Sequence, residues 1–171
     1  MPQHPFAPVF DAHSTILILG SFPSVKSREE GFYYAHPRNR FWRILSDWAG
    51  ECLPETVQAR RDFCLRHGIA LWDVLESCEI IGSSDASIRE AKRNDLRIIL
   101  DRAPIQRILL NGKTADRYFE RFQGEYPQLL VQVMPSTSPA NASWNLEKLE
   151  NEWFAALGGP NRDQNGEESP C

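Results

Sequence analysis

Four short apolar runs divide the chain and predict β-strands. They cover residues 15–19 (TILIL), 69–74 (IALWDV), 107–110 (RILL) and 129–134 (LLVQVM). The first run is apolar at successive positions, so both faces of that strand would be buried, which is typical of a strand covered on both sides. The pattern therefore predicts a sheet inside the molecule.

Between these runs, apolar residues recur every three to four positions, which predicts helices. The recurrences fall near residues 41–48, 55–67, 96–100, 115–122 and 146–157, and a Gly-Gly-Pro sequence stops the last one. Strands that alternate with helices indicate crossover connections and a parallel sheet with helices on both faces. We expect an α/β domain over residues 1–158 and a disordered, acid-rich tail over 159–171.

Composition excludes several classes of protein. The chain has 171 residues, 42% hydrophobic and 25% charged, as in ordinary globular proteins. No segment approaches the ~20 apolar residues that span a bilayer, and the N-terminus lacks the pattern of a secretory signal. The four cysteines lack metal-site spacing. We therefore expect a cytoplasmic protein with reduced thiols, no membrane partner, no metal and no cofactor.

The charge pattern leaves nucleic-acid binding open. The net charge of -4 argues weakly against it. Residues 26–43, however, hold five basic residues against two acidic ones, a local excess of three positive charges. A local basic segment of this kind can contact a phosphate backbone.

In parallel sheets, ligands bind beyond the carboxyl ends of the strands, so the segments after the strands are the candidates. The first is 20–24 (GSFPS), whose Gly and Pro favour a tight turn with exposed backbone N–H groups. Such a turn can hold a phosphate or orient a water molecule, which makes Ser21 and Ser24 candidate DNA contacts. An ordinary turn is about equally consistent with this segment alone.

The segment 31–42 (GFYYAHPRNRFW) interleaves aromatic and basic residues, as stacking on a base beside a phosphate backbone requires. Phe41 and Trp42 fit a helix core better than a binding role. Asn39 opens the predicted helix, where asparagine is a preferred cap, so capping alone would account for it. For His36 we favour a packed, hydrogen-bonded role that orders the loop.

The segment 134–144 (MPSTSPANASW) follows the last strand and combines two prolines with many hydroxyls. Its Ser136, Thr137 and Ser138 suit a phosphate clamp, although a capped, solvated turn is as consistent. Residues 111–114 (NGKT) resemble the end of a Walker A loop, but position 107 is Arg where that motif needs Gly, so a P-loop is rejected. Lys113 remains a candidate phosphate contact.

In order and separation, the segments GSFPS, FYYAHPRNRFW and MPSTSPANASW resemble the uracil-DNA glycosylase superfamily. The AHPxNRFW spacing is similar to the mismatch-specific uracil/thymine branch. The details GSFPS, YYAHPRN and MPSTSP are more similar to the hypoxanthine-DNA glycosylases, family 6, which remove deaminated adenine from DNA. The resemblance implies a three-layer α/β/α sandwich with a small four-stranded parallel sheet. It also implies a base that stacks on Tyr34 and a last motif that presses into the minor groove.

Three positions depart from the uracil-specific relatives. Phe22 stands where they carry Asp or Asn, Met134 where they carry His or Asn, and Trp72-Asp73 near an Asn that reads uracil. These departures argue against uracil excision by the usual route and agree with the hypoxanthine branch. In that branch the Asn of the HPRN segment matters for catalysis, which assigns the catalytic role to Asn39.

The resemblance thus predicts a monomeric, monofunctional glycosylase that flips hypoxanthine out of double-stranded DNA, hydrolyses its N-glycosidic bond and leaves an abasic site. The base would lie between Tyr34 and the strand ends, beside Phe22. Asp73 is a candidate for reading an N–H of the base or aiding the sugar cation, and a turn cap is as consistent. Whether Asn39 holds the water or the departing base stays open.

Two alternative functions remain. One is a mismatch-type uracil-DNA glycosylase that uses backbone groups in place of the lost side chains. The other is a catalytically inactive DNA-binding module, because Phe22 and Met134 make both usual catalytic positions apolar. A small-molecule enzyme on the same kind of sheet would leave the tyrosine pair and the hydroxyl-rich loop unexplained.

Overall fold

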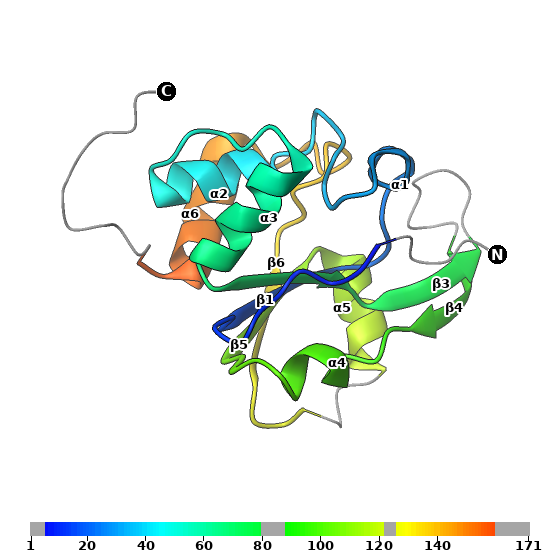
Figure 1. Ribbon diagram of the computed structural model, residues 1–171. Coiled ribbons are helices and arrows are strands. Elements are labelled where there is room, and N and C mark those ends of the chain that lie inside the picture. Colours follow the sequence, from blue (N-terminus) through cyan, green and yellow to red (C-terminus); the bar gives the residue numbers. More distant parts are fainter. Residues whose placement is uncertain (1–5, 80–87, 122–125, 160–171) are drawn as a thin grey trace.

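The computed structural model describes residues 6–79, 88–121 and 126–159 (Figure 1). Strands and helices alternate through most of the chain. In order, the elements are β1 (Ile16–Gly20), α1 (Val25–Glu30), α2 (Phe41–Ala49), α3 (Val57–Arg66), β2 (Ile69–Asp73), β3 (Leu75–Glu79), β4 (Arg89–Arg93), α4 (Arg97–Leu100), β5 (Arg107–Asn111), α5 (Lys113–Glu120), β6 (Leu130–Met134) and α6 (Leu146–Leu157).

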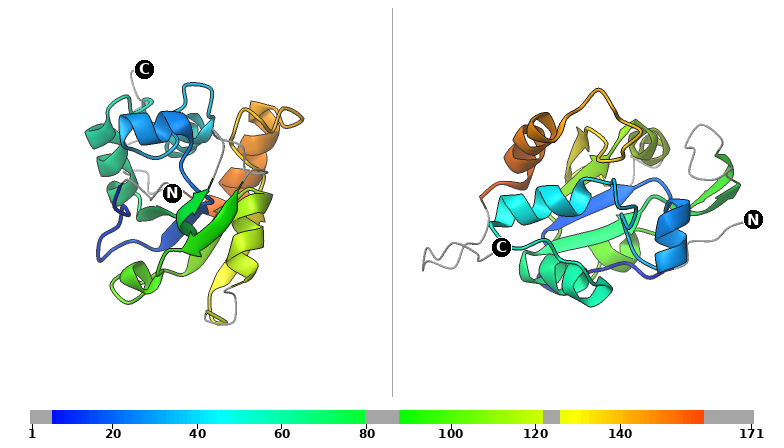
Figure 2. Two further views of the ribbon diagram at one scale, coloured as in Figure 1. Left: turned by 90° about the vertical axis from the view of Figure 1, so that its right-hand side faces the viewer. Right: turned by 90° about the horizontal axis from the view of Figure 1, so that it is seen from above.

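The central sheet has the strand order β2-β1-β5-β6, and all neighbouring strands are parallel. Strands β1 and β2 are buried along their whole length. Figures 1 and 2 show α2, α3 and α6 on one side of this sheet and α4 and α5 on the other. The predicted α/β/α sandwich with a four-stranded parallel sheet is confirmed. Parallel neighbours need crossover connections, and helices in those connections cover both faces.

Three elements were not predicted. Strands β3 and β4 form a separate antiparallel pair that continues directly from β2. Most residues of β4 (REAKR) are exposed, so this strand carries no alternation of apolar and polar residues. The short helix α1 begins directly after the GSFPS segment, where the apolar spacing predicted no helix. The Ser24 hydroxyl accepts from the N–H of Ser27 at its start, and Gly31, with φ 73°, ends it.

Buried tryptophans hold two of the loops that reach the carboxyl edge of the sheet. The Trp42 indole N–H donates to the Tyr33 carbonyl at 3.1 Å, and the Trp153 indole N–H donates to the Pro135 carbonyl at 3.0 Å. Trp42 is 3% exposed, as the core interpretation of this residue predicted. The aromatic core therefore fixes the two segments that carry the most distinctive sequence motifs.

The structure also bears on the predictions about membrane helices, cysteines and the C-terminal tail. In the described ranges no helix is both long enough and apolar enough to cross a membrane. Cys64 and Cys78 are free and buried, but Cys52 is disulfide-bonded, so the prediction of reduced thiols was wrong for Cys52. The predicted disordered tail lies outside the described residues, apart from Gly159.

Candidate active site at the carboxyl edge of the sheet

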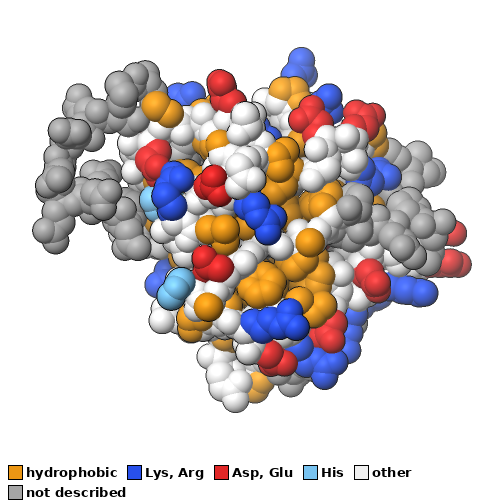
Figure 3. Space-filling view, viewed as in Figure 1, with side chains coloured by type: hydrophobic (Ala, Val, Ile, Leu, Met, Phe, Trp, Pro, Cys, Tyr) orange, Lys and Arg blue, Asp and Glu red, His pale blue; other side chains and the backbone are white. Residues whose placement is uncertain are grey.

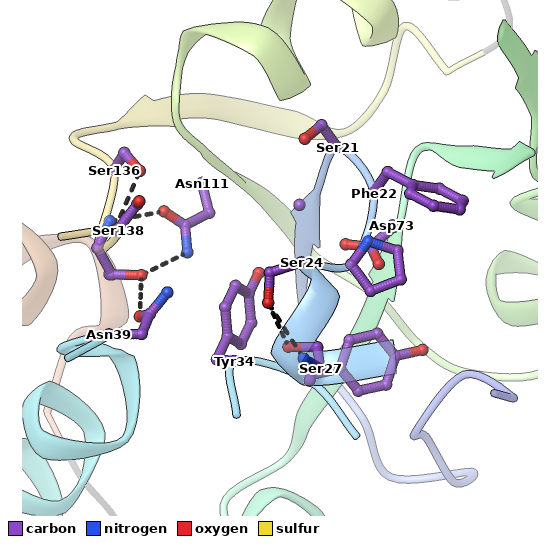
Figure 4. Close-up of a pocket in the computed structure, with 14 residues that line it drawn as sticks. Ser21, Phe22, Ser24, Ser27, Tyr34, Asn39, Asp73, Asn111, Ser136 and Ser138 are labelled. Atoms are coloured by element: carbon purple, nitrogen blue, oxygen red, sulfur yellow. Dashed lines mark hydrogen bonds between the residues drawn. The ribbon is translucent and has the colours of Figure 1, made fainter. Parts of the chain in front are cut away.

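A pocket opens where β1, β2 and β5 end, the position that parallel sheets favour for ligands (Figure 4). The strand ends contribute Gly20, Asp73 and Asn111. The loops and α1 contribute the remaining lining residues, which are Ser21, Phe22, Pro23, Ser24, Ser27, Tyr33, Tyr34, Asn39, Ser136, Thr137 and Ser138. All three motif segments therefore meet in one pocket.

Asn39 lies just before α2 and lines this pocket. Its side-chain oxygen accepts from the backbone N–H of Phe41, the first residue of α2, at 3.0 Å. The same oxygen accepts from the hydroxyl of Thr137 at 2.8 Å. Arg40 occupies the N-cap position of α2 and its side chain makes no capping bond, so the capping interpretation of Asn39 is not confirmed. Asn39 lies one residue earlier and bonds to the backbone two residues on, as asparagine side chains often do. The amide nitrogen is left on the pocket side.

Thr137 connects Asn39 to the end of β5. Its hydroxyl accepts from the Asn111 amide at 3.0 Å, and its backbone N–H donates to the Asn111 oxygen at 3.1 Å. Thr137 is fully buried. Its hydroxyl is therefore committed to the protein, which corrects the expectation that this side chain contacts a phosphate. The sequence suggested Thr137 only as one hydroxyl among several.

Tyr34 has a strained backbone and a tightly held ring. Its φ of 53° lies in the left-handed region, which non-glycine residues rarely adopt and which concentrates at functional sites. The ring stacks on Phe41 with centroids 4.0 Å apart, so one face is covered and a base would have to use the other. Burial raises the pKa of the Tyr34 hydroxyl well above its usual value, and the Asp73 carboxylate raises it further. Tyr34 therefore stays neutral.

Asp73 and the Tyr34 hydroxyl converge on Gly20 at the end of β1. A Cβ atom at Gly20 would lie 2.5 Å from the Asp73 Oδ1 and 3.2 Å from the Tyr34 Oη, so glycine permits this close approach. Asp73 is 3% exposed. Phe22 also lines the pocket and is mostly buried, with the Arg28 guanidinium 5.8 Å from its ring centre. The site thus joins a buried carboxylate to aromatic walls.

Four more of the predicted site residues are serines that line the pocket. They are Ser21, Ser24, Ser136 and Ser138. Figure 4 shows Ser24 hydrogen-bonded to Ser27 at the start of α1. The side-chain oxygen of Ser136 accepts from the Ser138 backbone N–H at 3.2 Å.

The last two predicted residues lie outside the pocket lining. His36 accepts from the Arg38 backbone N–H through Nδ1 at 3.0 Å, which matches the predicted loop-ordering role. Lys113 is the first residue of α5 and is exposed.

Arg40 has a role that the sequence did not reveal. Its guanidinium donates to the carbonyls of Ser138, at 2.8 Å, and of Asn141, at 3.2 Å, and also to that of Trp144. Its backbone N–H donates to the Thr137 carbonyl at 3.1 Å. Arg40 therefore holds the last loop against the start of α2. The charge count had treated it as a cation available to phosphate, but its guanidinium is used within the protein. The fork of five donors in arginine suits such a task.

Asn111 is the second residue that sequence reasoning missed. It ends β5 and is the first residue of the NGKT segment, yet only Lys113 of that segment was considered. The position of Asn111 after a predicted strand was the available signal. Its partner Thr137 is 26 residues further along the chain, and no local pattern links the two.

The fold and the pocket agree with the comparisons. The model of the Uracil DNA glycosylase superfamily matches residues 7–157, and the chain belongs to this superfamily. The chain is 34% identical over 165 residues to a protein named Hypoxanthine DNA glycosylase from Methanosarcina barkeri (strain Fusaro / DSM 804), covering 92% of this chain and 99% of the relative. A protein of the same name from Methanosarcina acetivorans is 34% identical over 159 residues, with the same shares covered.

A solved structure is also similar. It is the solution NMR structure of a candidate uracil DNA glycosylase from Methanosarcina acetivorans, with a TM-score of 0.78 and 31% sequence identity. The match covers 91% of this chain and 96% of the other. The family predicted from the three motifs is therefore confirmed, and the relatives carry the name of the predicted branch.

Proposed function

We propose that this protein is a DNA glycosylase that removes hypoxanthine from double-stranded DNA. The observation that carries the proposal is the pocket in which Asn39, Tyr34 and Asp73 meet at the carboxyl edge of the sheet. Phe22 and Met134 are buried apolar residues at this edge. The edge therefore lacks two polar groups that uracil-specific relatives use. The names of the relatives support the same substrate.

The reaction requires that the base leave the helix, because its glycosidic bond is not accessible inside the stack. The C1′–N9 bond breaks and its electron pair goes to the purine. The water oxygen bonds to C1′, one water proton stays on the new hydroxyl, and the other neutralises the released base. Positive charge develops on the sugar and negative charge on the base, so groups that stabilise either charge accelerate the reaction. Water is the only co-reactant.

For recognition, we assign Asp73 to the Watson–Crick edge of the base. Hypoxanthine has an N–H at N1, whereas adenine has a bare lone pair there. A buried carboxylate accepts but cannot donate, so it favours hypoxanthine and repels the adenine N1. Tyr34, backed by Phe41, and Phe22 would form the aromatic walls beside the base. Uracil offers a similar N–H, so this contact alone does not separate the two substrates.

The DNA backbone would be held at the rim of the pocket. The loop serines 21, 24, 136 and 138, with neighbouring backbone N–H groups, suit the phosphates beside the flipped nucleotide. Lys113, at the start of α5, would reach a more distant phosphate. On the face in Figure 3, basic and acidic side chains are interspersed, so this face offers no basic patch to DNA. The enzyme would act as a monomer in the cytoplasm.

A panel of labelled duplexes tests the proposal. Each duplex carries one deoxyinosine, deoxyuridine, deoxyxanthosine or deoxyadenosine, and alkali cleaves the abasic sites that form. We expect release of hypoxanthine and a fall of about 10²- to 10³-fold in Asn39→Ala, the usual loss for one donor to a developing charge. Uracil release without hypoxanthine release would favour the mismatch-type alternative. Salt-dependent binding without any cleavage would favour the inactive DNA-binding module.

A further inference from the structure

The backbone of α2 fixes which end of the Asn39 amide faces the pocket. A backbone N–H can only donate, and the N–H of Phe41 lies 3.0 Å from one side-chain atom of Asn39. That atom must be the oxygen, since a flipped amide would place two donors against each other. The orientation therefore does not depend on telling nitrogen from oxygen by shape, which is the usual ambiguity of asparagine side chains.

The Thr137 hydroxyl reinforces this orientation. Because Oδ1 of Asn39 carries no hydrogen, the contact of 2.8 Å requires that Thr137 donates to it. The single hydroxyl proton is then used, so Thr137 must accept from Asn111, at 3.0 Å. The Asn111 amide is oriented independently, because its oxygen accepts the backbone N–H of Thr137 at 3.1 Å. Two backbone N–H groups thus set the direction of every bond in this network.

The network leaves Asn39 with only hydrogen-bond donors for chemistry. The Asn39 oxygen already accepts two hydrogen bonds, which is the capacity of a carbonyl oxygen. The amide nitrogen has two N–H groups, and among the residues that the structure describes none is a hydrogen-bond acceptor for them. Figure 4 shows this nitrogen pointing toward the side of the pocket where Tyr34 lies. An amide N–H can donate to a substrate, but it cannot accept a proton from water.

We propose that Asn39 donates a hydrogen bond to an acceptor atom of the departing purine, and that Thr137 and Asn111 are positioning residues that hold it in this polarity. The inference rests on the proposed base-excision function. As the C1′–N9 bond breaks, the purine becomes negative, and a preorganised donor stabilises that charge more than it stabilises the neutral base. The water molecule would then be oriented by other groups.

Asn39→Asp separates a donor from a water-activating role. Aspartate keeps an oxygen for Phe41 and Thr137 and remains a good residue at a helix start, but it replaces the amide donor with an acceptor. We expect the single-turnover rate to fall about 10²-fold or more, with unchanged affinity for DNA. Retention or gain of activity in Asn39→Asp would overturn the proposal, because a carboxylate would activate water better than an amide does.

Thr137→Val and Thr137→Ser test the positioning role. Valine matches threonine in shape but removes the hydroxyl, so we expect the single-turnover rate to fall by about 10-fold. Serine retains the hydroxyl and should restore most of the rate. Thr114→Val, in α5 and outside the network, is the matched control. Equal rates for Thr137→Val and wild type would overturn the positioning role, and melting temperatures show whether each variant is folded.

Purine analogues identify the acceptor. Duplexes with 7-deaza- or 3-deaza-deoxyinosine each lack one ring nitrogen. On the analogue that lacks its partner, Asn39→Asp should cost no more than a few-fold, because wild type has already lost the contact. Asn39→Asp could instead lower the single-turnover rate by the same factor on both analogues and on a base without an acceptor at position 6. That result would exclude donation to the base.

The substrate for these measurements is whichever base the wild type releases. Release of uracil or xanthine but not hypoxanthine would overturn the proposed substrate, and the variants would still decide the donor role on that base. A wild type that releases no base overturns both proposals.

Discussion

The substitution Gly20→Ala tests the packing at the heart of the site. The new Cβ would lie 2.5 Å from the Asp73 Oδ1 and 3.2 Å from the Tyr34 Oη, closer than normal contacts. Gly20 does not need a left-handed backbone, so steric conflict is the only cost. The strands cannot separate easily, because Gly20 of β1 and Asp73 of β2 are register partners in the central sheet. The carboxylate must therefore move.

The size of the effect follows from the cost of overpacking. An extra carbon in a well-packed site typically costs about 1–3 kcal/mol. For a domain of this length each kcal/mol lowers the melting temperature by about 2–4 °C, so we expect a decrease of about 2–12 °C. The rate of excision should also fall, even at temperatures where the variant is fully folded, because Asp73 and Tyr34 are displaced from the base. Thermal unfolding and single-turnover excision measure the two effects separately.

Gly159→Ala is the matched control, because a Cβ there meets nothing within 4 Å and the backbone is not left-handed. It should be neutral or slightly stabilising through the unfolded chain. If Gly20→Ala melts with wild-type Tm and excises at the wild-type rate, Asp73 and Tyr34 do not converge on β1 as described. That result would also remove the basis for assigning Asp73 to base recognition.

Three further predictions concern the hydrogen bonds that hold the loops of the site and the dependence of stability on pH. Trp153→Phe leaves the Pro135 carbonyl without its donor and should cost about 1–3 kcal/mol in denaturant unfolding, with a matching loss of excision. Arg40→Met removes the carbonyl contacts of the last loop, so hydrogen exchange in residues 137–144 should accelerate more than exchange in the sheet. Burial and the neighbouring Asp47 raise the pKa of Glu150 to about 7. The folded state therefore binds this proton more tightly than the unfolded chain, and stability should fall as pH rises from about 4.5 to 7. Glu150→Gln should flatten this fall in urea titrations across the same pH range.

The architecture and the location of the site could be predicted from the amino-acid sequence alone. Apolar runs and helical spacing predicted the α/β order, because burial imposes a period that each strand and helix carries locally. The segments after the strands contained Asn39 and most other lining residues, since parallel strands bring their carboxyl ends to one edge. The exposed, charged strand β4 escaped prediction because it buries too little to show a period.

The contacts that hold the site together could not be predicted, because they join segments that are distant in the sequence. Asn39 and Thr137 lie 98 residues apart, and Arg40 reaches carbonyls at similar separations, so no local pattern relates them. The left-handed backbone of Tyr34 and the close approach at Gly20 depend on neighbours from other strands. The direction of the Asn39 amide is likewise set by hydrogen bonds that form only when β5, β6 and α2 come together. Residue type supplies donors and acceptors, and the packing of distant segments decides which of them face the substrate.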